Sequence, residues 1–158
     1  MKRLVYLFAI ILAAGSGVHG CDDGWEDIEG SCFKFDISMS LPWDDARVFC
    51  QSNGGDLAKV IDGNTHRGIW LYIQTYGLSG SFWLGASDVA AEGDWIWAKD
   101  ETRVSKGTPY WALRSTVLGY QQEPSGGAKE NCLALDEDRK YFFNDDACDL
   151  GHHPICMK

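Results

Sequence analysis

The chain reads WDDARVFCQSNGGDLAKVI from Trp43 to Ile61, a stretch that predicts a helix followed by a short strand. Apolar side chains recur at positions 43, 46, 49 and 50, which is the spacing of one face of a helix. Ser40 offers an N-cap, and Asn53-Gly54-Gly55 ends the helix. A short apolar strand is predicted over Leu57–Ile61.

Outward from this stretch, a second helix is expected to begin near Asp62 and to stop at Gly77. Its expected apolar face carries Ile69, Trp70 and Ile73. Further strands are predicted at Phe33–Ile37, Phe82–Gly85, Cys132–Leu135, Tyr141–Phe143 and Ile155–Met157. Between them, Ala86–Lys129 shows no long periodicity, and so long an irregular segment is usually functional. Early helices with late strands predict an α+β fold.

Length and composition bound the function. The 158 residues suit one domain, alone or behind a short leader, and seven Trp, seven Phe and six Tyr argue against disorder. The formal net charge of −9 argues against nucleic acid as a partner, because little would neutralise a phosphate backbone. It also disfavours electrostatic docking on anionic membranes.

The first twenty residues have the pattern of a signal peptide. Lys2 and Arg3 precede an uninterrupted apolar run over Leu4–Ala14. Spanning a bilayer takes roughly 20 apolar residues, so this run is too short for an anchor, and no second apolar run follows. We therefore expect a leader over residues 1–20, cleavage before Cys21 and a secreted protein without a membrane span. The pair Gly15/Gly17 is an alternative cleavage position.

Six cysteines lie beyond this leader, at positions 21, 32, 50, 132, 148 and 156. An even number in an exported chain predicts a disulfide framework, although six cysteines allow 15 pairings. Zinc is the alternative, but no Cys-x-x-Cys pair is present, and His152 and His153 are adjacent rather than at ligand spacing.

Several motifs occur in a recognisable order. They are Trp43-x-x-Ala46-x-x-x-Cys50, Phe82-Trp83-Leu84-Gly85, Trp95-x-Trp97, Glu123-Pro124, Glu130-Asn131-Cys132 and Phe143-Asn144-Asp145. With these motifs, residues 21–158 resemble a C-type lectin-like domain. The resemblance implies the C-type lectin fold, with two helices, antiparallel sheets and a long calcium-binding loop region. It also implies three disulfides: Cys21–Cys32, Cys50–Cys156 and Cys132–Cys148.

The resemblance implies a calcium site that also binds sugar. Its ligands, carried over residue by residue, are Glu123, Ser125, Glu130, Asn144 and Asp145. Calcium takes about 6 to 8 oxygen ligands, mostly carboxylates and carbonyls, and two sugar hydroxyls complete its shell in the family. Ser125 is a departure, because asparagine or aspartate is expected there. The family's glutamate before proline implies mannose-type rather than galactose-type glycans, and its proline implies a cis bond between Glu123 and Pro124.

A second, auxiliary calcium site is implied only in part. Asp88 and Glu92 match its spacing, and Glu130 would be shared between the two sites. However, Gly126 and Asn131 stand where carboxylates are common in the family.

The segment 112–122 is longer than usual in the family and either adds sugar contacts or covers the site. Trp111 and Tyr120 are the two aromatic residues we consider for stacking on a sugar ring. The other tryptophans on strand patterns, such as Trp83, Trp95 and Trp97, are expected in the core.

The sequence thus predicts a secreted, calcium-dependent lectin for mannose-type glycans, with a role in innate recognition. A single domain binds one sugar shallowly, so useful affinity for a glycan needs several sites at once. With all six cysteines expected in bridges, multivalency would have to come from a noncovalent homo-oligomer. The alternative is a protein or ice ligand, with calcium structural or absent. An enzyme is not expected, because His66, His152 and His153 offer no arrangement for nucleophilic catalysis, although Glu123 and Glu130 form a carboxylate pair.

Overall fold

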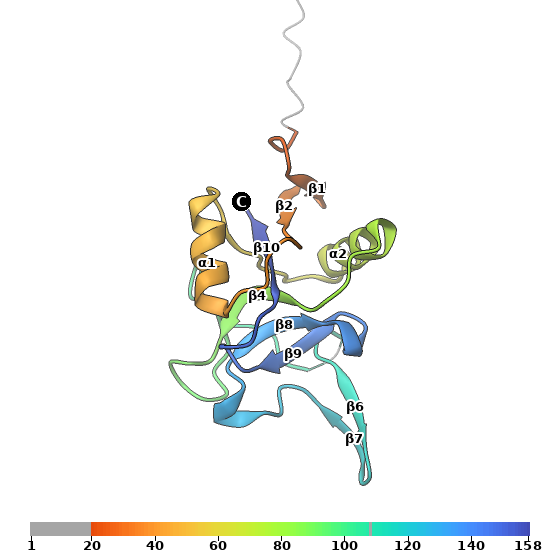
Figure 1. Cartoon of the computed structure of the whole chain (residues 1–158). Helices are drawn as coiled ribbons and strands as arrows, with labels where there is room; N and C mark the ends of the chain where they lie inside the picture. Colours follow the sequence, from red (N-terminus) through yellow and green to blue (C-terminus); the bar gives the residue numbers. More distant parts are fainter. Residues whose placement is uncertain (1–19, 108) are drawn as a thin grey trace, which may run out of the picture.

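The computed structural model describes residues 20–107 and 109–158. Two helices flank a central sheet, and a separate hairpin projects from the side of the molecule opposite the chain's first strands (Figure 1). The leader predicted over residues 1–20 lies outside the described residues except for Gly20.

The main sheet has the strand order β1-β2-β10-β4-β8-β9, with β3 paired to β10 and β5 paired to β4. Its strands are β1 (Glu26–Ile28), β2 (Ser31–Phe35), β3 (Asp56–Leu57), β4 (Phe82–Ser87), β5 (Ile96–Trp97), β8 (Cys132–Asp136), β9 (Phe142–Asp146) and β10 (His153–Met157). The pair β10 and β4 is parallel, whereas the other pairs are antiparallel. A second sheet consists of β6 (Leu113–Thr116) and β7 (Gly119–Gln122).

Helix α2 (Gly63–Tyr76) begins and ends where the sequence predicts. The Asp62 carboxylate accepts hydrogen bonds from the backbone N–H groups of Asn64 and Thr65, both at 2.9 Å, and Gly77 closes the helix with φ +61°. Ile69 and Ile73 are buried as expected. The placement of Trp70 beside them is wrong: its side chain is 39% exposed, because it lies at the edge of the apolar face and points away from the core.

Helix α1 (Trp43–Ser52) starts differently from the prediction. Its N-cap is Pro42 rather than Ser40, and no side chain caps it. Trp43, Ala46 and Cys50 are buried, and the Trp43 indole N–H donates to the carbonyl of Leu84 at 2.8 Å. This bond ties the first turn of α1 to β4 in the centre of the sheet.

The buried residues form two clusters. The smaller cluster contains Trp43 of α1, Trp83 and the Cys50–Cys156 bridge. The larger cluster contains Ile69 and Ile73 of α2 and most of the buried aromatic residues. Trp83, Trp95 and Trp97 are at most 2% exposed, which confirms their expected place. The disulfides are Cys21–Cys32, Cys50–Cys156 and Cys132–Cys148, the three pairs that the resemblance implies.

Three local predictions need correction. Ile37 lies beyond β2 and is 50% exposed, and the strand predicted over Leu57–Ile61 is reduced to the two-residue β3. The segment predicted as irregular, 86–129, contains β5, β6, β7 and the 3₁₀ helix η1 (Gly127–Lys129). Within the described residues, no helix combines the length and apolar character needed to cross a membrane.

Candidate ligand-binding site

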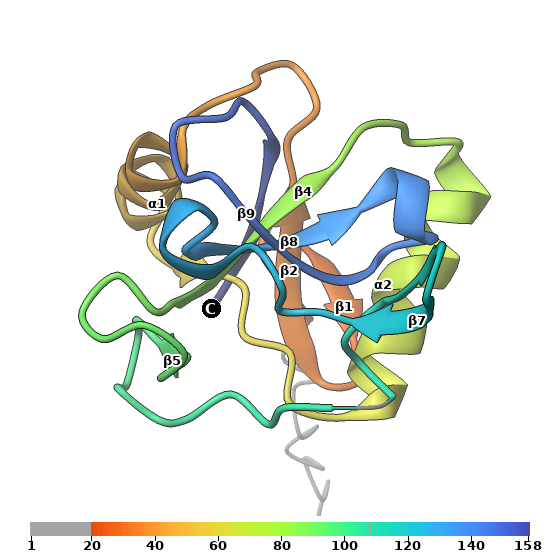
Figure 2. The same cartoon turned by 90° about the horizontal axis from the view of Figure 1, so that it is seen from below.

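The five residues predicted to bind calcium and sugar come from two neighbouring segments. Glu123 directly follows β7, Ser125 lies two residues later, and Glu130 follows η1. Asn144 and Asp145 lie on β9, opposite Ala134 and Leu133 of β8. We call the surface formed by residues 112–130 and the β8–β9 hairpin the loop face; Figure 2 views the molecule from this side.

Asp145 connects the two segments. Its carboxylate accepts hydrogen bonds from the backbone N–H groups of Ser125 at 3.0 Å and Gly126 at 2.6 Å, and the residue is 1% exposed. The Glu123–Pro124 peptide bond, which directly precedes this segment, is cis as the resemblance implies. At position 125 it is the backbone N–H that donates to Asp145.

Two arginines that the sequence reasoning missed face Glu123. Its Oε1 lies 3.6 Å from Arg114 Nε of β6 and 3.6 Å from Arg139 Nη2 of the 3₁₀ helix η2 (Glu137–Arg139). Glu123 is 3% exposed, and a buried carboxylate requires a compensating charge. The guanidinium groups supply it, although Glu123 Oε2 has no hydrogen-bond partner among the described residues.

Arg139 also holds Asn144. Its Nε donates to Asn144 Oδ1 at 2.8 Å and lies 3.2 Å from Asp136 Oδ2. The Asn144 amide in turn donates to the backbone carbonyl of Asp145 at 2.7 Å. The oxygen atoms of Asn144 and Asp145 expected to face calcium therefore already accept protein hydrogen bonds.

Glu130 completes the group. Partial burial raises the pKa of its carboxyl, and the charges of Asp145, Asp146 and Glu123 raise it further, while Arg114 opposes them. Its carboxylate also lies against Gly126, where an added Cβ would overlap it. The fold thus brings Glu123, Glu130 and Asp145 close enough for their charges to interact.

Of the auxiliary residues, Asp88 reaches this cluster. It is 2% exposed, and its Oδ2 accepts from the Gly93 N–H at 2.7 Å, whereas Oδ1 is buried without a partner in the described chain. Burial raises the pKa of Asp88, and the nearby Asp145 adds to the effect. Glu92 is exposed. Of the two residues, Asp88 is therefore buried near Asp145, whereas Glu92 lies in solvent.

These residues, as they lie, do not fit calcium. The ion needs about 6 to 8 oxygen ligands at roughly 2.3–2.6 Å. Arg139 engages Asn144 Oδ1, and the guanidinium groups of Arg114 and Arg139 face Glu123. Over residues 20–107 and 109–158, no three acidic, histidine or cysteine side chains are arranged to hold a metal ion. Positive charge at this position comes from arginine.

The aromatic candidates also differ. Trp111 is 1% exposed, and its indole N–H donates to the Ser105 carbonyl at 3.0 Å, so it is not available to stack on a sugar. Tyr120 on β7 is 82% exposed. The segment 112–122 forms the β6–β7 hairpin, which brings Arg114 over Glu123 and thereby helps to cover the site.

Comparisons with known proteins agree with this architecture. The family model described as Lectin C-type domain matches residues 39–158. C-type lectin domain family 10 member A of Rattus norvegicus is 30% identical over 156 residues, or 99% of this chain and 47% of that protein. Lactose-binding lectin l-2 of Anguilla japonica is 28% identical over 138 residues, or 87% of this chain and 77% of that protein.

A solved structure of a calcium-independent type II antifreeze protein has a similar fold. It has a TM-score of 0.65 and 25% sequence identity, and the match covers 87% of this chain and 93% of the other. The chain spans about half the length of the rat relative, which therefore contains further segments.

Proposed function

This chain belongs to the C-type lectin domain family, and from that membership we propose that it binds carbohydrate at the loop face. One observation carries the proposal: Arg114 and Arg139 face the buried Glu123, yet their side chains remain 41% and 27% exposed. A guanidinium presents several N–H donors in a fixed plane, and sugar hydroxyls accept such bonds. A glycan would therefore meet Arg114 and Arg139, with Glu130 near Arg114.

Calcium dependence is the point on which the resemblance and the geometry differ. The resemblance implies Ca²⁺ bound by Glu123, Ser125, Glu130, Asn144 and Asp145. The arginine contacts favour glycan binding without the ion at this position, because a guanidinium already faces Glu123 and Asn144. We propose the calcium-independent mode.

For the sugar class, mannose-type glycans are the first to test, since the glutamate before Pro124 is the family's mannose-type feature. A galactose-type ligand is the second, because one relative is named a lactose-binding lectin. The experiment is retention of the protein on immobilised mannose and lactose, in calcium and then in chelator. Retention that survives the chelator supports the proposal, and the Arg114→Gln variant is expected to elute earlier.

The matched control is Arg103→Gln, which removes an exposed arginine paired with Asp94, outside the cluster around Glu123. Release by the chelator would overturn the calcium-independent mode while keeping the lectin. No retention on either resin, with no glycan bound on a broader panel, would overturn carbohydrate binding itself.

A second candidate function is supported by the β6–β7 hairpin. Leu113, Val117, Leu118 and Tyr120 are 57%, 102%, 97% and 82% exposed, which is unusual for apolar side chains so close together. Such a surface suits a protein ligand or contact between copies of this chain, and a noncovalent oligomer would supply multivalency. An ice ligand belongs to the same alternative. Ice-recrystallisation assays and sedimentation of the Val117→Ser/Leu118→Ser variant separate these cases from glycan binding.

We further propose that the chain is exported and acts in recognition of foreign glycans outside the cell. The basic and apolar pattern of residues 1–20 and the three disulfides support export, because such bridges persist in oxidising compartments. N-terminal sequencing of the protein from culture medium tests this, with Cys21 as the expected first residue. A chain retained in the cell with Met1 intact would contradict it.

A further inference from the structure

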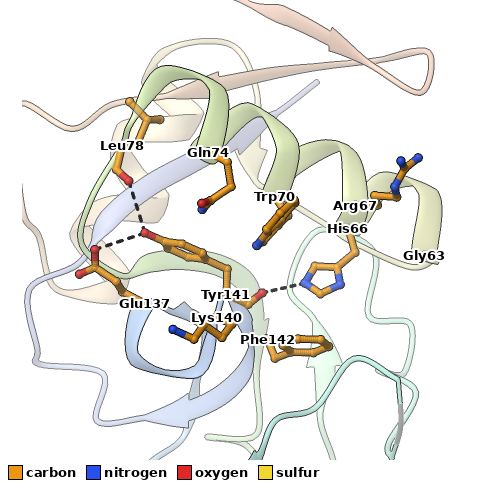
Figure 3. Close-up of a pocket in the computed structure, with 10 residues that line it drawn as sticks. All are labelled: Gly63, His66, Arg67, Trp70, Gln74, Leu78, Glu137, Lys140, Tyr141 and Phe142. Carbon is orange, nitrogen blue, oxygen red and sulfur yellow. Dashed lines mark hydrogen bonds between the residues drawn. The ribbon is translucent and has the colours of Figure 1, made fainter.

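One cavity among the described residues lies away from Glu123. It has a volume of about 650 Å³ and opens between α2 and the segment from η2 to β9 (Figure 3). One wall is a stripe of α2 that includes His66, Trp70 and Gln74, which share a helix face at three- and four-residue spacing. The other wall is formed chiefly by Glu137 and residues 140–142.

Aromatic side chains line this cavity. Tyr141 forms part of it and is 5% exposed, whereas Trp70 and Phe142 are each 39% exposed. The core positions of α2 are Ile69 and Ile73, so Trp70 is not needed to bury the helix. An indole held at the edge of a cavity is a flat apolar surface on which a ring can stack.

The polar groups of the cavity are mostly donors without partners. The side chains of Arg67, Gln74 and Lys140 make no hydrogen bond or ion pair with other residues that the structure describes. The residues that line the cavity include two cations, Arg67 at one end and Lys140 at the other, against the single acid Glu137, although the chain as a whole has a net charge of −9 (Figure 3). This local charge favours an anionic ligand.

The back of the cavity is fixed by hydrogen bonds. His66 Nε2 lies 2.7 Å from the Tyr141 carbonyl, and the Tyr141 hydroxyl lies 3.4 Å from both the Leu78 carbonyl and Glu137 Oε1 (Figure 3). Lys140 and Tyr141 both have left-handed backbone angles, φ +60° and +62°, which residues with a Cβ seldom adopt. Such angles persist where the surrounding contacts impose them, so the wall is preformed.

We propose that this cavity is a second carbohydrate site, for a sugar ring that bears a carboxylate. The ring stacks on Trp70, and its carboxylate pairs with Lys140. Gln74 and His66 Nδ1 remain for the ring hydroxyls, because a neutral His66 must carry its proton on Nε2 to donate to Tyr141. The site shares the β8–β9 hairpin with the loop face but involves neither Glu123 nor the two arginines that face it.

The test is calorimetry of the whole protein with glucuronic acid in the presence of a chelator, with glucose and acetate as matched probes. We expect glucuronic acid to bind, glucose to bind about tenfold more weakly, and acetate to give no heat. Trp70→Ala is expected to weaken glucuronic acid about tenfold. Lys140→Gln should reduce the preference for glucuronic acid over glucose.

The matched control is Leu71→Ala, an exposed residue on the same helix that does not line this cavity and should leave binding unchanged. Should Trp70→Ala fail to fold, the exposed Lys140→Gln carries the test. Absence of binding at millimolar glucuronic acid overturns the site, and so does native affinity in both variants. Equal affinity for glucose and glucuronic acid overturns the carboxylate part. Native affinity is expected in Arg114→Gln, so the outcome is distinguishable from failure at the loop face.

Discussion

Arg139 joins Asn144 to Glu123: its Nε donates to Asn144 Oδ1 at 2.8 Å, and its Nη2 lies 3.6 Å from Glu123 Oε1. One guanidinium therefore bridges a residue of β9 and a residue that follows β7. A cation is needed there because Glu123 is buried and Glu130 and Asp145 lie nearby. The side chain of Arg139 meets that need from within the protein.

We predict that calcium does not stabilise the native protein. Its melting temperature should be the same in millimolar calcium and in chelator, because no binding free energy is added to the folded state. A filled site would instead raise the melting temperature by about 5 °C or more. Differential scanning calorimetry measures this.

The Arg139→Gln variant sharpens this test. Removing the guanidinium leaves the carboxylates without their cation, so calcium should now raise the melting temperature. Arg103→Gln, whose arginine pairs with Asp94, should remain insensitive to calcium. If calcium raises the melting temperature of the native protein and Arg139→Gln abolishes this shift, Arg139 does not take the place of calcium.

We predict that Glu123→Gln destabilises the protein by about 1–3 kcal/mol. The change leaves Arg114 and Arg139 facing a neutral amide, and they are only partly able to reach water, at 41% and 27% exposed. Urea unfolding measures the cost. Glu92→Gln on the exposed surface should change stability by less than about 0.5 kcal/mol, and equal losses in the two variants would show that Glu123 has no special role.

Local signals explain which parts of the fold could be predicted. The bounds of α2 follow from Asp62 and Gly77, whose capping effects act within one turn of the helix. Trp70 was misplaced because periodicity gives a helix face but not what packs against its edge. Ser40 failed as a cap for a related reason, since the chain enters α1 through Pro42.

The residues of the candidate site also fall into those that the sequence could predict and those that it could not. Glu123, Glu130 and Asp145 could be grouped because the family resemblance supplies their positions. Arg114 and Arg139 could not, because Arg114 reaches Glu123 across the β6–β7 hairpin and Arg139 reaches it from η2, and both contacts depend on tertiary structure. Likewise, the length of segment 112–122 was visible in the sequence, but its folding into β6 and β7 was not.

We predict that stability falls as the pH drops below about 6.5, partly through His66. Burial lowers the pKa of His66 below its ordinary 6.5. The unfolded chain therefore binds more protons below 6.5, and the contribution is lost as pH falls through the folded value. Urea midpoints at pH 7.5 and 5.5 measure the loss.

His66→Gln isolates this contribution, since glutamine keeps a donor for the Tyr141 carbonyl but does not titrate. Comparison with the variant is necessary because the raised pKa of Glu130 acts in the opposite direction. The variant should lose less stability between the two pH values than the native chain. An unchanged difference would mean that His66 is equally accessible to protons in the folded and unfolded states.

The disulfides should contribute unequally. Cys50–Cys156 closes a separation of 106 residues, against 11 for Cys21–Cys32, so the chain-entropy model assigns them about 4.8 and 2.8 kcal/mol. We therefore predict that the Cys50→Ser/Cys156→Ser variant has a lower free energy of unfolding than Cys21→Ser/Cys32→Ser, by about 2 kcal/mol. Urea unfolding of both variants measures the difference. Burial strengthens the order, because Cys50 and Cys156 are 0% exposed and a serine pair there would bury hydroxyl groups in the core beneath α1. Equal losses would mean that the unfolded chain retains structure joining its ends.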